Sequence, residues 1–138
     1  MKVFVDTSVF ISYFLKRDIL NKETIDKFDF YKKQNVIFLT SNYIIDELFT
    51  WFCTKKTKFF LEKVINAISE IQETRTIKVF YIDKFICKKA EKVIIKFFEH
   101  RISFTDATTY VLYKDFSLDE VFTLDSDFKK IGVNTAFK

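Results

Sequence analysis

The sequence has very few glycine, proline, cysteine and histidine residues. Among 138 residues there are one glycine, no proline, two cysteines and one histidine. The scarcity of glycine and proline excludes collagen-like, linker-rich and proline-rich classes. The lone histidine, His100, argues against Ser-His-Asp hydrolysis and excludes every metal site that needs two imidazoles. Metal chemistry in this chain would therefore use carboxylates, which select hard cations such as Mg²⁺ or Mn²⁺.

Cysteine usage and hydropathy favour a cytoplasmic protein. Cys53 and Cys87 are 34 positions apart with no second pair, which supports neither a disulfide framework nor a cysteine zinc site. We expect both to be buried free thiols, and His100 to be a polar residue at a helix C-terminus. No apolar run approaches the roughly 18–20 residues of a membrane span, and Asp6 comes too early for the apolar region of a signal peptide. We therefore expect no membrane association.

The residues that are present have a globular balance. Apolar residues make up 49% and charged residues 30% of the chain, which predicts one compact domain over 1–138. The net charge of +4 is spread unevenly, because residues 51–101 carry 12 basic and 6 acidic side chains, whereas residues 102–138 carry 4 basic and 6 acidic ones. A basic surface beside an acidic centre suits a polyanion held near metal ions. Lysines that only solvate helix faces would produce the same imbalance.

Apolar runs alternate with segments of helical periodicity. The runs predict strands over 2–5, 36–39, 77–82 and 121–124, with a possible final strand over 133–137. The periodic segments predict helices over 9–14, 22–34, 42–54, 57–74, 84–100, 103–114 and 126–131. Gly132 follows the last helix, where a C-cap favours a positive φ. Strands separated by helices predict an α/β fold, with a central parallel sheet of four or five strands and helices on both faces.

Four acidic residues fall where such a sheet would bring them together. Asp6 directly follows the first strand and Asp125 the fourth, and the carboxyl ends of parallel strands open on the edge where these folds place their sites. Asp106 in the first turn of its helix, and Glu47 about one turn into its own, can reach the same edge. Ionised carboxylates in one cluster are costly without cations. The cluster is therefore expected either to bind metal or to have raised pKa values.

Each acid also has a purely structural explanation. Helix capping is the alternative role for three of them, through Asp6 or Ser8, Ser103 with Asp106, and Asp125 or Ser126. Caps explain each acid singly, but not why the acids recur at one edge of the sheet. Glu47 could be an ordinary solvent-facing residue, because Asp46 and Glu47 flank the apolar stripe of their helix about symmetrically. Periodicity alone leaves open which of these two faces the site.

Four short motifs occur in order along the chain: VDTS at 5–8, SNYIIDE at 41–47, SFTDA at 103–107 and FTLDSDF at 122–128. Together they resemble the PIN-domain ribonucleases, and more narrowly the VapC-type toxins of prokaryotic toxin–antitoxin pairs. The resemblance covers essentially the whole chain. It implies a single PIN-like domain over 1–138 and a metal-dependent endoribonuclease.

Carried over position by position, the resemblance makes Asp6 and Asp106 the core metal ligands. Glu47, rather than Asp46, would be the second acid of the family pattern, and Asp125 the fourth.

The resemblance also suggests supporting residues around these ligands. The hydroxyls of Thr7, Ser103 and Thr105 would hold metal-bound water or orient carboxylates. Asp127 would contact the ligands indirectly or be a bystander.

The implied chemistry is hydrolysis of RNA phosphodiesters with Mg²⁺ or Mn²⁺ as cofactor. Metal-activated water would attack in line and leave a 5′-phosphate and a 3′-hydroxyl, which requires no histidine or lysine base. Basic side chains of the middle segment would contact the flanking phosphates, and exposed aromatic side chains would stack on unpaired bases.

The toxin interpretation further implies two protein partners. One is a cognate antitoxin, whose peptide would lie in an apolar groove and block the site. The other is a second copy of the chain, in a homodimer. Trp51 and Phe52 are candidates for the groove, and ordinary core packing is the alternative for both.

Other functions are also compatible with parts of this sequence. A haloacid-dehalogenase-type phosphotransferase would have an aspartate where Ser8 stands. Toprim-type catalysis would use Asp125 and Asp127, but with an early glutamate where this chain offers Asp6. A housekeeping PIN-domain RNA-processing nuclease, or a non-catalytic module that binds RNA or a partner, would use the same scaffold.

Overall fold

The computed structural model describes residues 1–137. At its centre is a parallel sheet of four strands in the order β3-β2-β1-β4. The strands are β1 (Lys2–Val5), β2 (Ile37–Ser41), β3 (Ile77–Phe80) and β4 (Glu120–Phe122). In the central strand, Phe4 lies opposite Leu39 of β2 and Val121 of β4. The prediction of a parallel α/β sheet is confirmed, with four strands.

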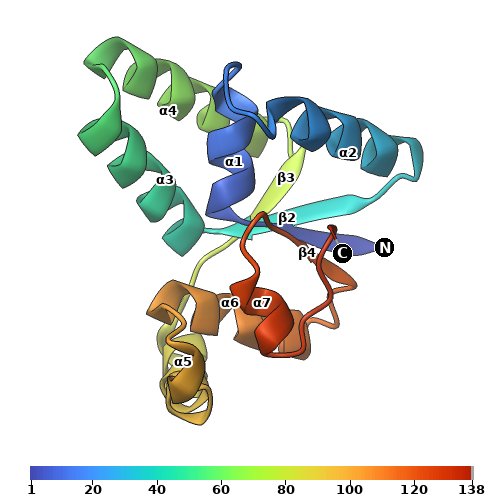
Figure 1. Ribbon diagram of the computed structural model, residues 1–138, viewed down its shortest axis with the longest axis vertical. Coiled ribbons are helices and arrows are strands. Elements are labelled where there is room, and N and C mark those ends of the chain that lie inside the picture. The colour runs from blue at the N-terminus through green and yellow to red at the C-terminus, as the bar shows by residue number, and fades with distance from the viewer. Residues whose placement is uncertain (138) are drawn as a thin grey trace.

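Helices cover both faces of this sheet (Figure 1). On one face lie α1 (Thr7–Phe14), α2 (Asn21–Lys33), α3 (Asn42–Lys55) and α4 (Lys58–Glu73). On the other face lie α5 (Lys84–Lys96), α6 (Phe104–Asp115) and the single turn α7 (Asp127–Lys130). No helix within residues 1–137 is both long and apolar enough to cross a membrane.

The order of the strands reverses beside β1. The connections from β1 to β2 and from β2 to β3 run over one face, whereas the connection from β3 to β4 runs over the other and places β4 on the free side of β1. In open parallel sheets, ligands bind at the carboxyl ends of the strands at such a reversal. The fold therefore indicates a functional site at the residues that follow β1 and β4.

Aromatic side chains hold the sheet and helices together. Phe28 and Tyr31 of α2 pack edge-on against Phe38 of β2 and Phe122 of β4, with ring centroids 4.9–5.9 Å apart. Burial of one such side chain contributes about 1.5–3 kcal/mol relative to exposure. A chain with 19 phenylalanines thus fills its core with bulky side chains, and these contacts hold α2 against β2 and β4.

Local capping starts the helices where polar residues precede them. The side chains of Ser41, Thr57, Asp83 and Ser103 each accept the backbone N–H three positions further on. Gly132 adopts φ +81°, as predicted for the residue that ends the last helix. These caps fix where α3 and α6 begin, and so position Glu47 about one turn into α3 and Asp106 in the first turn of α6.

The possible fifth strand over 133–137 does not form a ladder. It is reduced to one bridge between Val121 and Thr135. The Thr135 hydroxyl donates to the Phe137 carbonyl at 2.8 Å, a local contact that competes with strand pairing.

The helix predicted over 84–100 is shorter than its periodicity suggests. α5 ends at Lys96, and a 3₁₀ turn, η1 (Phe98–His100), follows it. Arg101 closes this turn in the left-handed conformation, at φ +53°. His100 therefore lies exposed at the end of a 3₁₀ turn rather than of an α-helix.

Two predictions about α3 are wrong. Cys53 is exposed rather than buried, because the neighbouring Phe52 takes the inward position and Cys53 the outward one. Phe52 is fully buried and packs against Phe14 and Phe60, so it belongs to the core and not to a groove. Cys87 is half-buried.

Candidate active site

Asp6 lies at the carboxyl end of β1, where the sheet reverses. Its backbone N–H donates to the Phe122 carbonyl at 3.0 Å, which continues the pairing of β1 with β4. Its side chain is buried and makes no cap hydrogen bond to α1, so the capping explanation of Asp6 is wrong. Instead, Asp6 Oδ2 accepts hydrogen bonds from Thr123 Oγ1 at 2.8 Å and from Ser8 Oγ at 3.0 Å.

Burial raises the pKa of Asp6 above its usual value, and the nearby Glu47 carboxylate adds to this effect. The two hydroxyl hydrogen bonds favour the charged form and oppose the shift, but they do not outweigh desolvation. An acid buried at such a cost beside another acid is typical of a functional site.

Glu47, and not Asp46, faces this edge of the sheet. Ser41 caps α3 by accepting the Ile44 N–H at 3.3 Å, and Glu47 follows about one turn later. Thr7 Oγ1 donates to Glu47 Oε1 at 2.6 Å, whereas Asp46 is exposed to solvent. A hydroxyl from the start of α1 thereby fixes the glutamate beside Asp6.

Asp106 approaches from the opposite face, on the first turn of α6. The predicted capping box is present, because the Asp106 N–H donates to Ser103 Oγ at 3.0 Å and the Ser103 N–H donates to Asp106 Oδ2 at 3.2 Å. Burial, then the charge of Asp6 and, to a smaller degree, that of Asp125, raise the pKa of Asp106 to about 6. The residue therefore caps its helix and also lies within the electric field of two other candidate acids.

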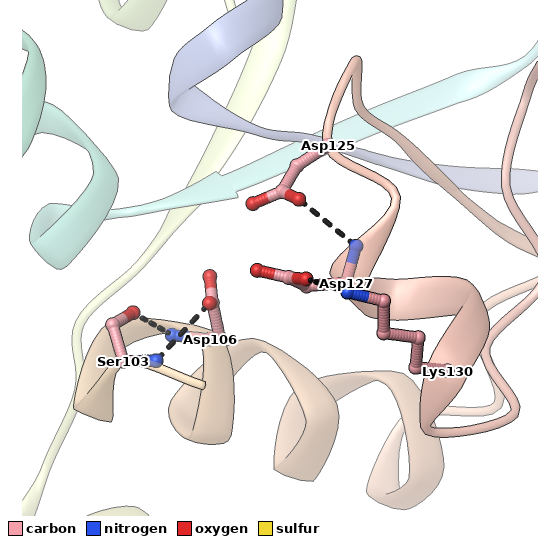
Figure 2. Close-up of polar contacts among 5 residues, drawn as sticks. All are labelled: Ser103, Asp106, Asp125, Asp127 and Lys130. Carbon is pink, nitrogen blue, oxygen red and sulfur yellow. Dashed lines mark hydrogen bonds and ion pairs between the residues drawn. The ribbon is translucent and has the colours of Figure 1, made fainter. Parts of the chain in front are cut away.

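Asp125 lies in the segment between β4 and α7, and Asp127 is the first residue of α7. The Asp127 N–H donates to Asp125 Oδ1 at 2.9 Å, so Asp125 does cap the start of α7, whereas Ser126 makes no side-chain cap. Asp127 Oδ1 accepts from Lys130 Nζ at 2.8 Å. Figure 2 shows the carboxylates of Asp106, Asp125 and Asp127 pointing toward one another.

The fold thus brings the four predicted acids to one edge, but not into a finished metal pocket. Within residues 1–137, no three acidic, cysteine or histidine side chains converge closely enough to hold an ion. Each carboxylate is instead engaged by a protein donor, as described above, and mutual repulsion opposes closer approach. The donor set nevertheless fits a hard divalent cation, since it consists of carboxylate and hydroxyl oxygens.

The predicted supporting residues divide into two groups. The Thr7 hydroxyl donates to the Glu47 carboxylate, whereas the Ser103 hydroxyl accepts the backbone N–H of Asp106 and it is the Ser103 backbone N–H that donates to the Asp106 carboxylate. Thr105 is half-buried, and its hydroxyl makes no hydrogen bond within the described part of the chain.

Sequence reasoning missed Ser8 and Thr123 as members of this site. Besides binding Asp6, Ser8 Oγ accepts the Leu124 N–H at 3.0 Å, and Thr123 Oγ1 accepts the Asp125 N–H at 3.0 Å. These bonds tie the start of α1 to the end of β4. The only sequence signal was spacing, since each hydroxyl lies two positions from a candidate acid.

Fold and site together define an open parallel α/β domain with an acidic centre at its strand reversal. The PIN domain family model matches residues 3–134, and the chain belongs to this family.

Solved structures from three bacteria have the same fold. The VapC20 toxin of Mycobacterium tuberculosis, described as cleaving the sarcin–ricin loop, superposes with a TM-score of 0.80 at 18% identity over 95% of each chain. VapBC2 from Rickettsia felis, bound to a promoter DNA fragment, has a TM-score of 0.74 at 12% identity over 98% of this chain and 97% of that one. FitAcB from Neisseria gonorrhoeae has a TM-score of 0.68 at 17% identity over 96% and 95%. No curated protein sequence matches the chain significantly.

Proposed function

We propose that this PIN-domain protein is a Mg²⁺- or Mn²⁺-dependent endoribonuclease and acts in the cytoplasm as the toxin of a type II toxin–antitoxin pair. The observation that carries the proposal is that Asp6, Glu47, Asp106 and Asp125 lie along one edge of the sheet, where the charge of Glu47 acts on Asp6 and the charges of Asp6 and Asp125 act on Asp106, and the pKa values of Asp6 and Asp106 are raised. Membership of the PIN family and the shared fold of VapC20, described as a toxin that cleaves the sarcin–ricin loop, support it.

The four acids would hold the divalent ion, which would supply charge neutralisation and an activated water for phosphodiester hydrolysis. The chain's own residues set up this centre. Ser8 and Thr123 hold Asp6 Oδ2 in place, and Thr7 holds Glu47. Asp106 must be ionised to act as a ligand. Since its pKa is about 6, a fraction of the Asp106 carboxyl groups is still protonated at slightly acidic pH, and binding of the ion would release that proton.

The direct test is divalent-dependent cleavage of a single-stranded RNA by the purified protein. We expect cleavage with Mg²⁺ or Mn²⁺, no cleavage in excess EDTA, and recovery when either ion is added back. The products should carry 5′-phosphates. RNA binding without cleavage in both ions would contradict the proposal and favour a non-catalytic binding module on this scaffold.

A cavity of about 740 Å³ offers a docking site for the proposed antitoxin. Its walls are apolar side chains from the end of α1 and the start of α4, and its rim is basic: Phe14, Leu15, Phe59, Phe60 and Val64, with Lys16, Arg17, Lys56 and Lys63. A segment with apolar anchors and acidic flanks would match this surface.

Charge reversal at the rim tests this docking site. We expect Lys63→Glu to weaken binding of the proposed antitoxin by about tenfold or more, because like charges would face each other across the contact. Lys92→Glu on α5 makes the same change in net charge away from the cavity and should leave the affinity unchanged. Equal losses in the two variants would show only a general electrostatic effect.

The homodimer also stays a proposal. Large apolar side chains that a second copy would cover are exposed at both ends of α5 and in the turn after it, since Phe85, Ile95 and Phe98 are 81%, 74% and 56% exposed. Sedimentation of the purified protein would determine its oligomeric state.

A further inference from the structure

Four ion pairs occur among the described residues, and one of them belongs to the candidate active site. The pairs of Lys22 with Asp26, Lys88 with Glu91 and Lys89 with Asp115 lie on α2, α5 and between α5 and α6. In the fourth pair, Lys130 Nζ lies 2.8 Å from Asp127 Oδ1, and Asp127 points toward the other acids (Figure 2).

The fold holds Lys130 in this position. Phe128 is buried and anchors the single turn α7, and Gly132 ends it at a positive φ. Lys130 therefore faces back along the turn toward Asp127, three residues earlier. The hydrogen bond to Asp127, then the charge of Asp127 and, more weakly, that of Asp125 raise the pKa of Lys130, so the ammonium lies in the field of both carboxylates.

The pair is easily opened. The Lys130 side chain is 52% exposed and that of Asp127 33% exposed, and exposed pairs of this kind contribute little to stability. A lysine is also a mobile point charge that suits a phosphate oxygen. When cations neutralise the neighbouring acids, the attraction that keeps Lys130 on Asp127 falls, and an RNA phosphate becomes the stronger partner.

We propose that Lys130 is a substrate-contacting residue, which leaves Asp127 to bind an RNA phosphate beside the carboxylates. The proposal rests on the proposed ribonuclease function and selects one lysine from the 23 basic residues of the chain. It makes a double prediction. Loss of the Lys130 charge should weaken RNA binding and, because a positive charge beside the acids is removed, should strengthen divalent-ion binding. A lysine remote from the acids, such as Lys22, would not move these two affinities in opposite directions, and the salt dependence of RNA binding distinguishes a phosphate contact from the field of the charge alone.

The experiment compares Lys130→Met with Lys22→Met. Both variants remove one positive charge and one exposed ion pair of similar length, 2.8 and 2.7 Å, but Lys22 lies on α2 and pairs with Asp26, outside the acidic centre. The measurements are KM and kcat for a single-stranded RNA, the Kd for Mn²⁺ from isothermal titration calorimetry, and the Kd for a labelled RNA oligonucleotide in Ca²⁺ at several salt concentrations.

For Lys130→Met we expect KM and the RNA Kd to rise about 5- to 10-fold and the Mn²⁺ Kd to fall about 2-fold, with kcat little changed. The slope of log K against log salt should decrease by about 0.7, the value for one phosphate contact on a single strand. Lys130→Arg should keep the wild-type KM. Lys22→Met should change none of these values.

A second variant distinguishes a Lys130 that contacts RNA from a Lys130 that only holds Asp127 in place. Asp127→Asn releases Lys130 without removing it, so RNA binding should be equal to or tighter than that of the wild type. If Asp127→Asn weakens RNA binding as much as Lys130→Met does, or if Lys130→Met matches Lys22→Met, the proposal is overturned. Since the RNA and Mn²⁺ affinities are measured without turnover, these outcomes remain distinct from a failure of the wild type to cleave RNA.

Discussion

Asp6→Asn is expected to lower divalent-dependent RNA cleavage by about 100-fold or more while the protein stays folded. Removal of a residue that only supports a metal ligand typically costs 10- to 100-fold, and a direct ligand should cost at least as much. Asparagine has the shape of the buried aspartate, and the hydroxyls of Ser8 and Thr123 can each donate or accept, so both hydrogen bonds to position 6 can be retained. The loss should therefore come from the missing negative charge. The measurement is the initial rate of cleavage of one RNA substrate in Mn²⁺.

The matched control for this variant is Asp46→Asn. It also removes one carboxylate, on α3 beside Glu47. However, Asp46 is exposed and lies outside the hydrogen-bond network of Asp6. We expect its rate to stay within about 2-fold of the wild type, because surface substitutions of this kind rarely disturb a site. Circular dichroism spectra that match the wild type would establish that both variants are folded. If Asp6→Asn retained full activity, the assignment of the acidic centre would fail.

The elements of the fold were predictable because local signals and the global pattern agree. Apolar runs, helical spacing and capping residues such as Ser41 and Asp83 coincide with observed elements. The prediction failed where a competing contact decides the structure. The hydroxyl of Thr135 turns the last residues away from a strand ladder, and no sequence period reports that contact.

The site was less predictable, because its geometry depends on contacts between distant residues. Periodicity could not choose between Asp46 and Glu47, and the structure distinguishes them through a hydroxyl of Thr7, 40 positions away. Thr123 lies 117 positions from Asp6 and yet holds its carboxylate. Such partners are determined by the order of the strands in the sheet, which places β4 beside β1. No local stretch of the sequence predicts that order.

The site also explains how capping and function can share one residue. Asp106 completes a capping box with Ser103 through one oxygen, and helix capping had seemed to compete with a role in the site. The cap instead fixes the backbone from which the Asp106 carboxylate enters the field of Asp6 and Asp125. The capping box that starts α6 thus also places Asp106, a candidate metal ligand, in the site.

Asp106→Asn is expected to stabilise the metal-free protein at neutral pH while it abolishes cleavage. The pKa of Asp106 is about 6 in the folded protein, above its ordinary value of 3.8, because burial and the charges of Asp6 and Asp125 disfavour the ionised form. Between these two values the folded state binds more protons than the unfolded state, so this carboxyl lowers stability as the pH rises through about 4 to 6. Asparagine removes the penalty and can still accept the Ser103 N–H. After allowance for solvent screening, the gain at pH 7 is about 1–2 kcal/mol.

Urea denaturation of both proteins from pH 4 to pH 8, in EDTA, measures this difference. The two curves of unfolding free energy should nearly coincide at pH 4 and separate above pH 6, with the variant more stable. Asp115→Asn is the control, since it removes a carboxylate from the other end of the same helix, where that carboxylate pairs with Lys89, and it should give no gain at pH 7. Saturating Mn²⁺ should stabilise the wild type but not Asp106→Asn, because an ion bound to the folded state relieves the same repulsion. A variant no more stable than the wild type at pH 7 would mean that the acids at this edge do not strain one another. The case for a shared divalent site would then lose its electrostatic basis.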